Sequence, residues 1–341
     1  MAVLGSLFLA VHLVLPQLAG LRSTAEALAR AAWWLPLVVI VLEAVSYIAY
    51  GELSLALLRG QGEHASRGLV QRATVVGASL GRTLPGGSTT ALAVLIRTLR
   101  RAGVDATSAT IALGSSGAIS SVTLALLVPV AALVAMAGGQ AGGVTLGALA
   151  TAGVIVLAVG TLPVAARSPE GLAGAVGQLV RRVVPRRWQG RLSPDRAQRA
   201  VAAALWDVRR LLGQPRLLRT ALGLAALNWL LDAAVLAVVA MTIGAGTPLP
   251  SLLLVYILGQ LTAAVPLTPG GVGVVEAAMT AAFVAAGAPA PDATATVLGW
   301  RLVSHWLPIG VGLALLPTVA GGRDAPPGPG RPVRPRGAPG G

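Results

Sequence analysis

The residues of this chain that could do chemistry are a few charged side chains inside otherwise apolar segments. Glu276 and Arg301 lie in two successive apolar runs of the second half, and Arg82 and Asp232 lie in two others. An ionisable group at the centre of a bilayer costs roughly 2.5 kcal/mol or more unless it is paired or hydrated. We therefore expect Glu276 to pair with Arg301, and Asp232 to pair with Arg82 or Arg301.

Two roles are open for each of these groups. The Glu276–Arg301 pair either gates or binds a substrate headgroup, with the guanidinium offering a bidentate fork to phosphate, or it is a structural clamp. Arg82 either meets a lipid phosphate or extends to the membrane surface. For Asp232 a structural ion pair is the simpler reading. All four residues are candidate substrate-binding residues.

The other titratable groups give weaker signals. Glu43, with Tyr47 one turn later, is a further buried acid for which packing or a proton role is open. The three histidines lie in different elements, so we predict no metal site and no cofactor. His305 follows Arg301 by one helical turn on the same face and either tunes it or only packs.

Two interrupted apolar segments must position these groups. Each contains a Pro-Gly-Gly; a Pro removes a backbone donor and Gly weakens the helix. Paired breaks in the two halves of a membrane protein indicate a transport site, although glycines also permit close helix approach. The residues expected to form the breaks are Pro85, Gly86 and Gly87 in the first copy and Pro269, Gly270, Gly271 and Gly273 in the second.

The composition is that of an all-α polytopic membrane protein. Hydrophobic residues make up 55% of the chain, charged residues 11%, and the mean hydropathy is +0.77. Cysteine is absent, which excludes disulfides and thiolate chemistry. Every one of the 26 basic residues is Arg, so phosphate loops and Schiff bases that need Lys are excluded as well.

The apolar runs divide residues 1–320 into one transmembrane domain with two repeat halves, about 33–137 and 217–318. We predict two broken or re-entrant hairpins, 69–84 with 88–101 and 250–266 with 272–286, which could equally be extra spans. The Pro- and Gly-rich residues 321–341 are expected to be a disordered tail. About six full crossings are predicted, at 2–20, 33–58, 107–137, 143–166, 217–242 and 293–318.

The arginines predict the orientation. With the Arg-rich loop 167–216 in the cytoplasm, 22 of the 26 arginines fall on the inner side, which places both termini in the cytoplasm of an inner cell membrane. Three crossings then separate the hairpins, so the two would enter from opposite sides as an inverted repeat. This distribution also argues against nucleic acid as the reason for the net charge of +14.

Helix-start signals occur at three further places. Ser193-Pro194-Asp195 is typical of an N-cap, and the helix that follows either lies on the inner membrane surface or is a solvated connector. Asp105 and Asp292, each in an Asp-Ala-Thr, are expected to be N-caps.

The second half carries a resemblance to a known family. Residues 265–276, with Gly287, Trp300-Arg301 and Leu307-Pro308 after them, are similar to the flippase-like transmembrane domain of lysylphosphatidylglycerol synthase (the multiple peptide resistance factor) and its free-standing relatives. Asn228 to Asp232 also fits. In the first half Leu84 to Gly87 fits the family's broken helix, but residues 88–90 differ from the Gly-Gly-Asp of many relatives.

The resemblance implies a lipid translocator, flippase-like or scramblase-like, that handles an anionic, aminoacylated or polyprenyl-linked lipid. Membrane lipids are the expected partners. We expect no counterpart of the synthase's soluble aminoacyl-transferase domain, and hence no enzyme activity. Two alternatives stay open: a membrane-embedded lipid transferase with Glu276 or Asp232 as base, and a non-catalytic partner of a lipid-modifying enzyme.

Overall fold

The structure, a computed structural model, describes residues 33–84, 87–139, 166–183, 193–264 and 268–320, and five single positions between 153 and 164. All regular elements in these ranges are helical. Their bounds are α2 (Leu35–Gly60), α3 (Arg67–Thr83), α4 (Gly87–Arg101), α5 (Ala106–Ala137), α7 (Pro169–Val183), α8 (Pro194–Leu212), α9 (Pro215–Ile243), α10 (Leu249–Ala264), the 3-10 turn η2 (Pro269–Gly271), α11 (Val274–Ala285), α12 (Ala290–Arg301), the π-helical turn η3 (Leu302–Trp306) and α13 (Leu307–Ala320).

Four helical segments in the described ranges are long and apolar enough to cross a membrane: α2, α5, α9, and the continuous run of α12, η3 and α13. They coincide with four of the six predicted crossings. The other two predictions, 2–20 and 143–166, lie wholly or mostly outside the described residues.

Both predicted helix interruptions are present. The first helix of each hairpin ends at Thr83 or Ala264, and the second begins at Gly87 or Val274. Pro85 and Gly86 lie outside the described residues. The Gly87 amide donates to the carbonyl of Leu84 (2.9 Å). In each pair the two helices pack against each other as a hairpin.

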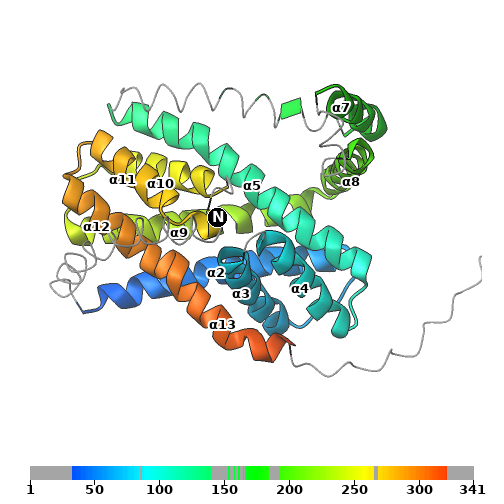
Figure 1. Cartoon of the computed structure of the whole chain (residues 1–341), viewed down its shortest axis with the longest axis horizontal. Helices are drawn as coiled ribbons and strands as arrows, with labels where there is room; N and C mark the ends of the chain where they lie inside the picture. Colours follow the sequence, from blue (N-terminus) through cyan, green and yellow to red (C-terminus); the bar gives the residue numbers. More distant parts are fainter. Residues whose placement is uncertain are drawn as a thin grey trace, which may run out of the picture.

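The two halves pack on each other reciprocally. The first spans of the halves, α2 and α9, lie side by side, α5 packs against α10, and α13 packs against α3 (Figure 1). The span that follows one hairpin therefore contacts the first arm of the other hairpin. This crossed arrangement brings the two interruptions into one region, because each hairpin is held by the opposite half.

The Arg-rich segment contains two helices, α7 and α8, which pack together at one edge of the molecule (Figure 1). The predicted helix at Ser193 is confirmed as α8, whereas α7 was not predicted. Arg210 joins this pair to the membrane helices by donating to the Gln61 side chain and to the carbonyl of Gly60 (3.2 Å).

The two Asp-Ala-Thr motifs behave differently. Asp105 is an N-cap: its carboxylate accepts from the Ser108 amide (2.9 Å), which lowers the pKa of the carboxyl. The same prediction for Asp292 is wrong, because α12 begins at Ala290, after Pro289, and Asp292 lies in its first turn. The second motif has prolines before it that start the helix earlier.

Candidate functional site

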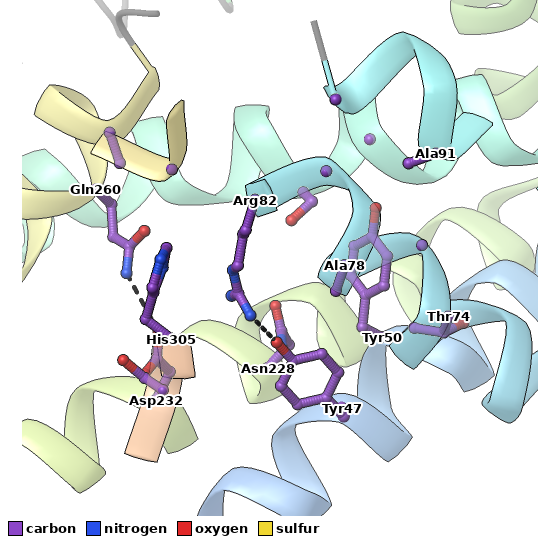
Figure 2. A pocket seen from close by; sticks show the side chains of 18 of the residues that line it. Tyr47, Tyr50, Thr74, Ala78, Arg82, Ala91, Asn228, Asp232, Gln260 and His305 are labelled. Carbon is purple, nitrogen blue, oxygen red and sulfur yellow. Dashed lines mark hydrogen bonds between the residues drawn. The ribbon is translucent and has the colours of Figure 1, made fainter. Parts of the chain in front are cut away.

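Both interruptions border a cavity of about 930 Å³. Its lining comes from both halves, and its polar side chains come mainly from α2, α3, α9, α10 and the α12–η3 junction (Figure 2), with hydroxyl groups from α4 and α5 as well. Several of these polar side chains lie in the middle of long apolar helices. The cavity is therefore polar at a level where the outward faces of the helices are apolar. Of the predicted site residues, Arg82, Asp232, Arg301, Gly87, Gly270 and Gly271 line the cavity.

Arg82, in the last turn of α3, extends into this cavity (Figure 2). Its guanidinium donates to the hydroxyl of Tyr47 and lies 5.8 Å from the centre of the Tyr47 ring. Within the part of the chain that the structure describes, no carboxylate forms an ion pair with Arg82. Since a guanidinium has five N–H donors, Arg82 keeps most of its capacity to bind an anion.

Asp232, near the middle of α9, is held by neutral donors. Its carboxylate accepts from the Tyr256 hydroxyl (2.9 Å), the Gln260 amide (3.2 Å) and the Trp300 indole (2.9 Å). The prediction that Asp232 pairs with Arg82 or Arg301 is therefore wrong. Uncharged hydrogen-bond donors stabilise a buried carboxylate as well, and they are harder to recognise in a sequence than an opposite charge.

The predicted pairing of Arg301 with Glu276 is confirmed. Arg301 is 4% exposed; its Nε donates to Glu276 (2.7 Å), one terminal nitrogen contacts Nδ1 of His305 (3.0 Å), and the other donates to the carbonyl of Gly270 (3.0 Å). All three guanidinium nitrogens are thus engaged by the protein. Arg301 ties the α12–η3 junction to the second helix break.

Glu276 lies behind the cavity wall and is not among the lining residues. Its second carboxylate oxygen accepts from the amide of Gly273 (2.7 Å), the residue that precedes α11. Gly270, Gly271 and Gly273 all have positive φ angles (62°, 68° and 84°), which L residues with a side chain rarely adopt. Glu276 therefore holds together a break that requires these glycines.

Glu43 is the other acid in the cavity wall. Its side chain is on α2, 5% exposed, and its Oε2 atom has no hydrogen-bond partner within the described ranges. Near it, Ser46 and Asn228 join α2 to α9: Asn228 donates to the Ser46 hydroxyl (2.8 Å) and to its carbonyl (3.1 Å). The helix pair that carries Glu43 and Asp232 is thus fixed by polar contacts.

Comparison with known proteins identifies the family. The family model described as "Lysylphosphatidylglycerol synthase TM region" matches residues 2–312. The chain belongs to this family. It is also similar to a UPF0104 membrane protein of Methanothermobacter thermautotrophicus (strain Delta H), with 30% identity over 132 residues, which is 37% of this chain and 39% of that protein.

This family, the lysylphosphatidylglycerol synthase transmembrane region, is the one that the sequence motifs resemble. The structure shows which contacts the residues of those motifs make. Trp300-Arg301 supplies one donor to Asp232 and the whole Arg301 clamp. Tyr256 and Gln260 were not predicted as partners of Asp232. Gln260 is an amide in an apolar run, and that polarity is the signal that could have identified it.

Proposed function

We propose that this protein is a membrane lipid translocator, flippase-like or scramblase-like, which passes an anionic, aminoacylated or polyprenyl-linked headgroup through the cavity between the two helix breaks. The observation that carries the proposal is Arg82: a cation that lines a cavity flanked by apolar spans and has no carboxylate partner in the described part of the chain. A phosphate would supply the missing negative charge. The tail of the lipid would stay among the apolar outer faces.

The helix breaks support the same proposal. Interrupted helices paired across two halves place unsatisfied backbone groups at a substrate site, and rocking of one half against the other opens it to alternate sides. The reciprocal packing of α5 on α10 and of α13 on α3 is the arrangement expected of two related halves. We propose that the halves are inverted in the inner cell membrane, with both termini in the cytoplasm.

A transferase is the weaker alternative, because the two residues that the sequence suggests as a base are occupied. Asp232 accepts three hydrogen bonds, and Glu276 binds Arg301 and Gly273 behind the cavity wall. A non-catalytic partner of a lipid-modifying enzyme is the other alternative. Such a role would not require an arginine open to a ligand.

Reconstitution into vesicles with a fluorescent phosphatidylglycerol tests the proposal. We expect wild type to move the labelled lipid between leaflets and Arg82→Gln to lose most of that activity. Arg72→Gln is the matched control, since Arg72 is an exposed arginine on the same helix whose Nε donates to a backbone carbonyl. Product formation without translocation would favour the transferase. Inactivity of wild type together with co-purification of an enzyme would favour the partner role.

Cysteine labelling tests the inversion separately. The chain has no cysteine, so single cysteines at the exposed positions 102 and 290, each shortly after a hairpin, can be labelled with a membrane-impermeant reagent. We expect the two positions to react from opposite sides. Labelling of both from one side would refute the inverted arrangement and leave the cavity to be tested as above.

A further inference from the structure

Glu43 is a buried acid that neither the helix breaks nor the Arg301 clamp uses. It lies within the membrane span α2, is 5% exposed, and has one carboxylate oxygen without a partner although it lines the cavity. It is one helical turn before Tyr47, the residue that binds Arg82. An ionised carboxylate with an unsatisfied buried oxygen is costly, whereas the protonated acid is neutral.

The charges around Glu43 determine how readily its carboxyl group ionises. Arg301 is balanced by Glu276, and His305 is neutral, because its Nδ1 accepts from Arg301, which can only donate. Asp232 is held by neutral donors and Arg82 forms no ion pair in the described part of the chain, so Arg82 is the charge that can stabilise an ionised Glu43. The titratable groups that line the cavity with Glu43 are Tyr47 and Tyr50 on α2, Arg82 on α3, Asp232 on α9, Arg301 on α12 and His305 on η3.

We propose that Glu43 is a proton-binding site, and that its proton and an anionic headgroup at Arg82 favour each other's binding. The inference rests on the proposed function. A phosphate at Arg82 removes the positive charge that could otherwise stabilise an ionised Glu43, so the bound anion holds the proton on Glu43 more firmly. By linkage, protonation of Glu43 must strengthen binding of the anion by the same factor.

This coupling gives the transport step a direction. A headgroup with one negative charge that crosses together with a proton on Glu43 carries no net charge through the cavity. The proton comes from the solution on the side where the headgroup enters, and it returns to solution on the side where the headgroup leaves. A pH gradient would then drive the lipid toward the less acidic side.

Binding of dihexanoyl phosphatidylglycerol to the purified full-length protein, measured across a pH series, tests the proposal. We expect affinity in wild type to fall as pH rises, by roughly tenfold or more, in the usual range of a coupling between two sites. Glu43→Gln, which mimics the protonated acid, should keep the high affinity at every pH. Glu52→Gln is the matched control, because Glu52 is on the same helix but binds Arg67 and Gln71 away from the cavity.

The outcomes separate the two proposals. If the lipid binds with the same pH dependence in wild type and in Glu43→Gln, the proton site is wrong and the translocator is untouched. If no anion binds at any pH, the anion site at Arg82 is wrong as well. Infrared difference spectra of wild type against Glu43→Gln give an independent reading: addition of the lipid at constant pH is expected to increase the protonated carboxyl band of Glu43, and a band that the lipid leaves unchanged would overturn the inference.

Discussion

Two arginines at one cavity, one from each half of the chain, have opposite surroundings. All three nitrogens of Arg301 are bound, to a carboxylate, an imidazole and a backbone carbonyl, whereas Arg82 is bound to a single tyrosine hydroxyl. Residue type in a membrane protein therefore does not distinguish a clamp from a binding group. The number of partners does: it shows that Arg301 holds the site together, and it supports the proposal that Arg82 receives a ligand.

Alignment of the two Pro-Gly-Gly segments shows that the residues of the clamp occur in the second half and not at the equivalent positions of the first. Glu276 and Arg301 correspond, at the 184-residue spacing of the two Pro-Gly-Gly segments, to Leu92 and Gly117 in the first half. Both of these neutral residues line the cavity. The first half, which has no such clamp, thus contributes to the cavity small or neutral lining residues and Arg82, which forms no ion pair within the described ranges. The second half contributes a helix break that the Glu276–Arg301 pair holds together.

The largest effect is expected from removing the clamp. Arg301→Gln leaves Glu276 as an uncompensated buried charge, and breaking a buried pair in this way costs about 3–5 kcal/mol. We expect a strongly lowered unfolding midpoint in detergent and loss of transport. Arg72→Gln on the exposed face should unfold like wild type. A stable Arg301→Gln that fails only in lipid binding would show that Arg301, too, is a binding group.

A comparison of two glycines measures the break itself. Gly270 and Gly287 both have positive φ angles, where a side chain costs about 1–2 kcal/mol. A Cβ atom on Gly270 would also come within 2.7 Å of the His305 ring and 2.9 Å of the Arg82 carbonyl, while Gly287 has open space. We expect Gly270→Ala to lower stability clearly more than Gly287→Ala. Equal losses would mean that the contact between the two breaks is loose.

Replacing Asp232 should lower the free energy of unfolding by an intermediate amount. Asp232→Asn keeps one oxygen but cannot accept from Tyr256, Gln260 and Trp300 together, so a buried donor loses its partner at a cost of about 1–3 kcal/mol. Thermal unfolding measures this loss. A change as large as that of Arg301→Gln would indicate that Asp232 depends on a cation and not only on neutral donors.

The sequence predicted the parts of this molecule that depend on charge and on breakers of helices. Two Pro-Gly-Gly segments predicted two interruptions, and a buried acid with a buried arginine predicted the Glu276–Arg301 pair. Partners of Asp232 were mispredicted, because Tyr256, Gln260 and Trp300 look like ordinary members of apolar helices until packing brings them together. The sequence also could not predict which of these residues line the cavity. Glu276 lies behind the cavity wall, because the rotation of its helix, which residue type does not reveal, directs its side chain away.

Exchange of each arginine for lysine is the finest test of the contrast between the two halves. A lysine keeps the charge but has no planar fork. At position 301 it cannot reach a carboxylate, an imidazole and a carbonyl at once, so Arg301→Lys should resemble Arg301→Gln. At position 82 it gives up one hydrogen bond to Tyr47, worth about 0.5–1.5 kcal/mol, and still presents a positive charge to phosphate. Arg82→Lys should therefore fold like wild type and bind dihexanoyl phosphatidylglycerol within about tenfold of it, a loss of about 1.4 kcal/mol. If Arg82→Lys binds as poorly as Arg82→Gln, the anion is recognised by the fork of Arg82 and not by its charge alone.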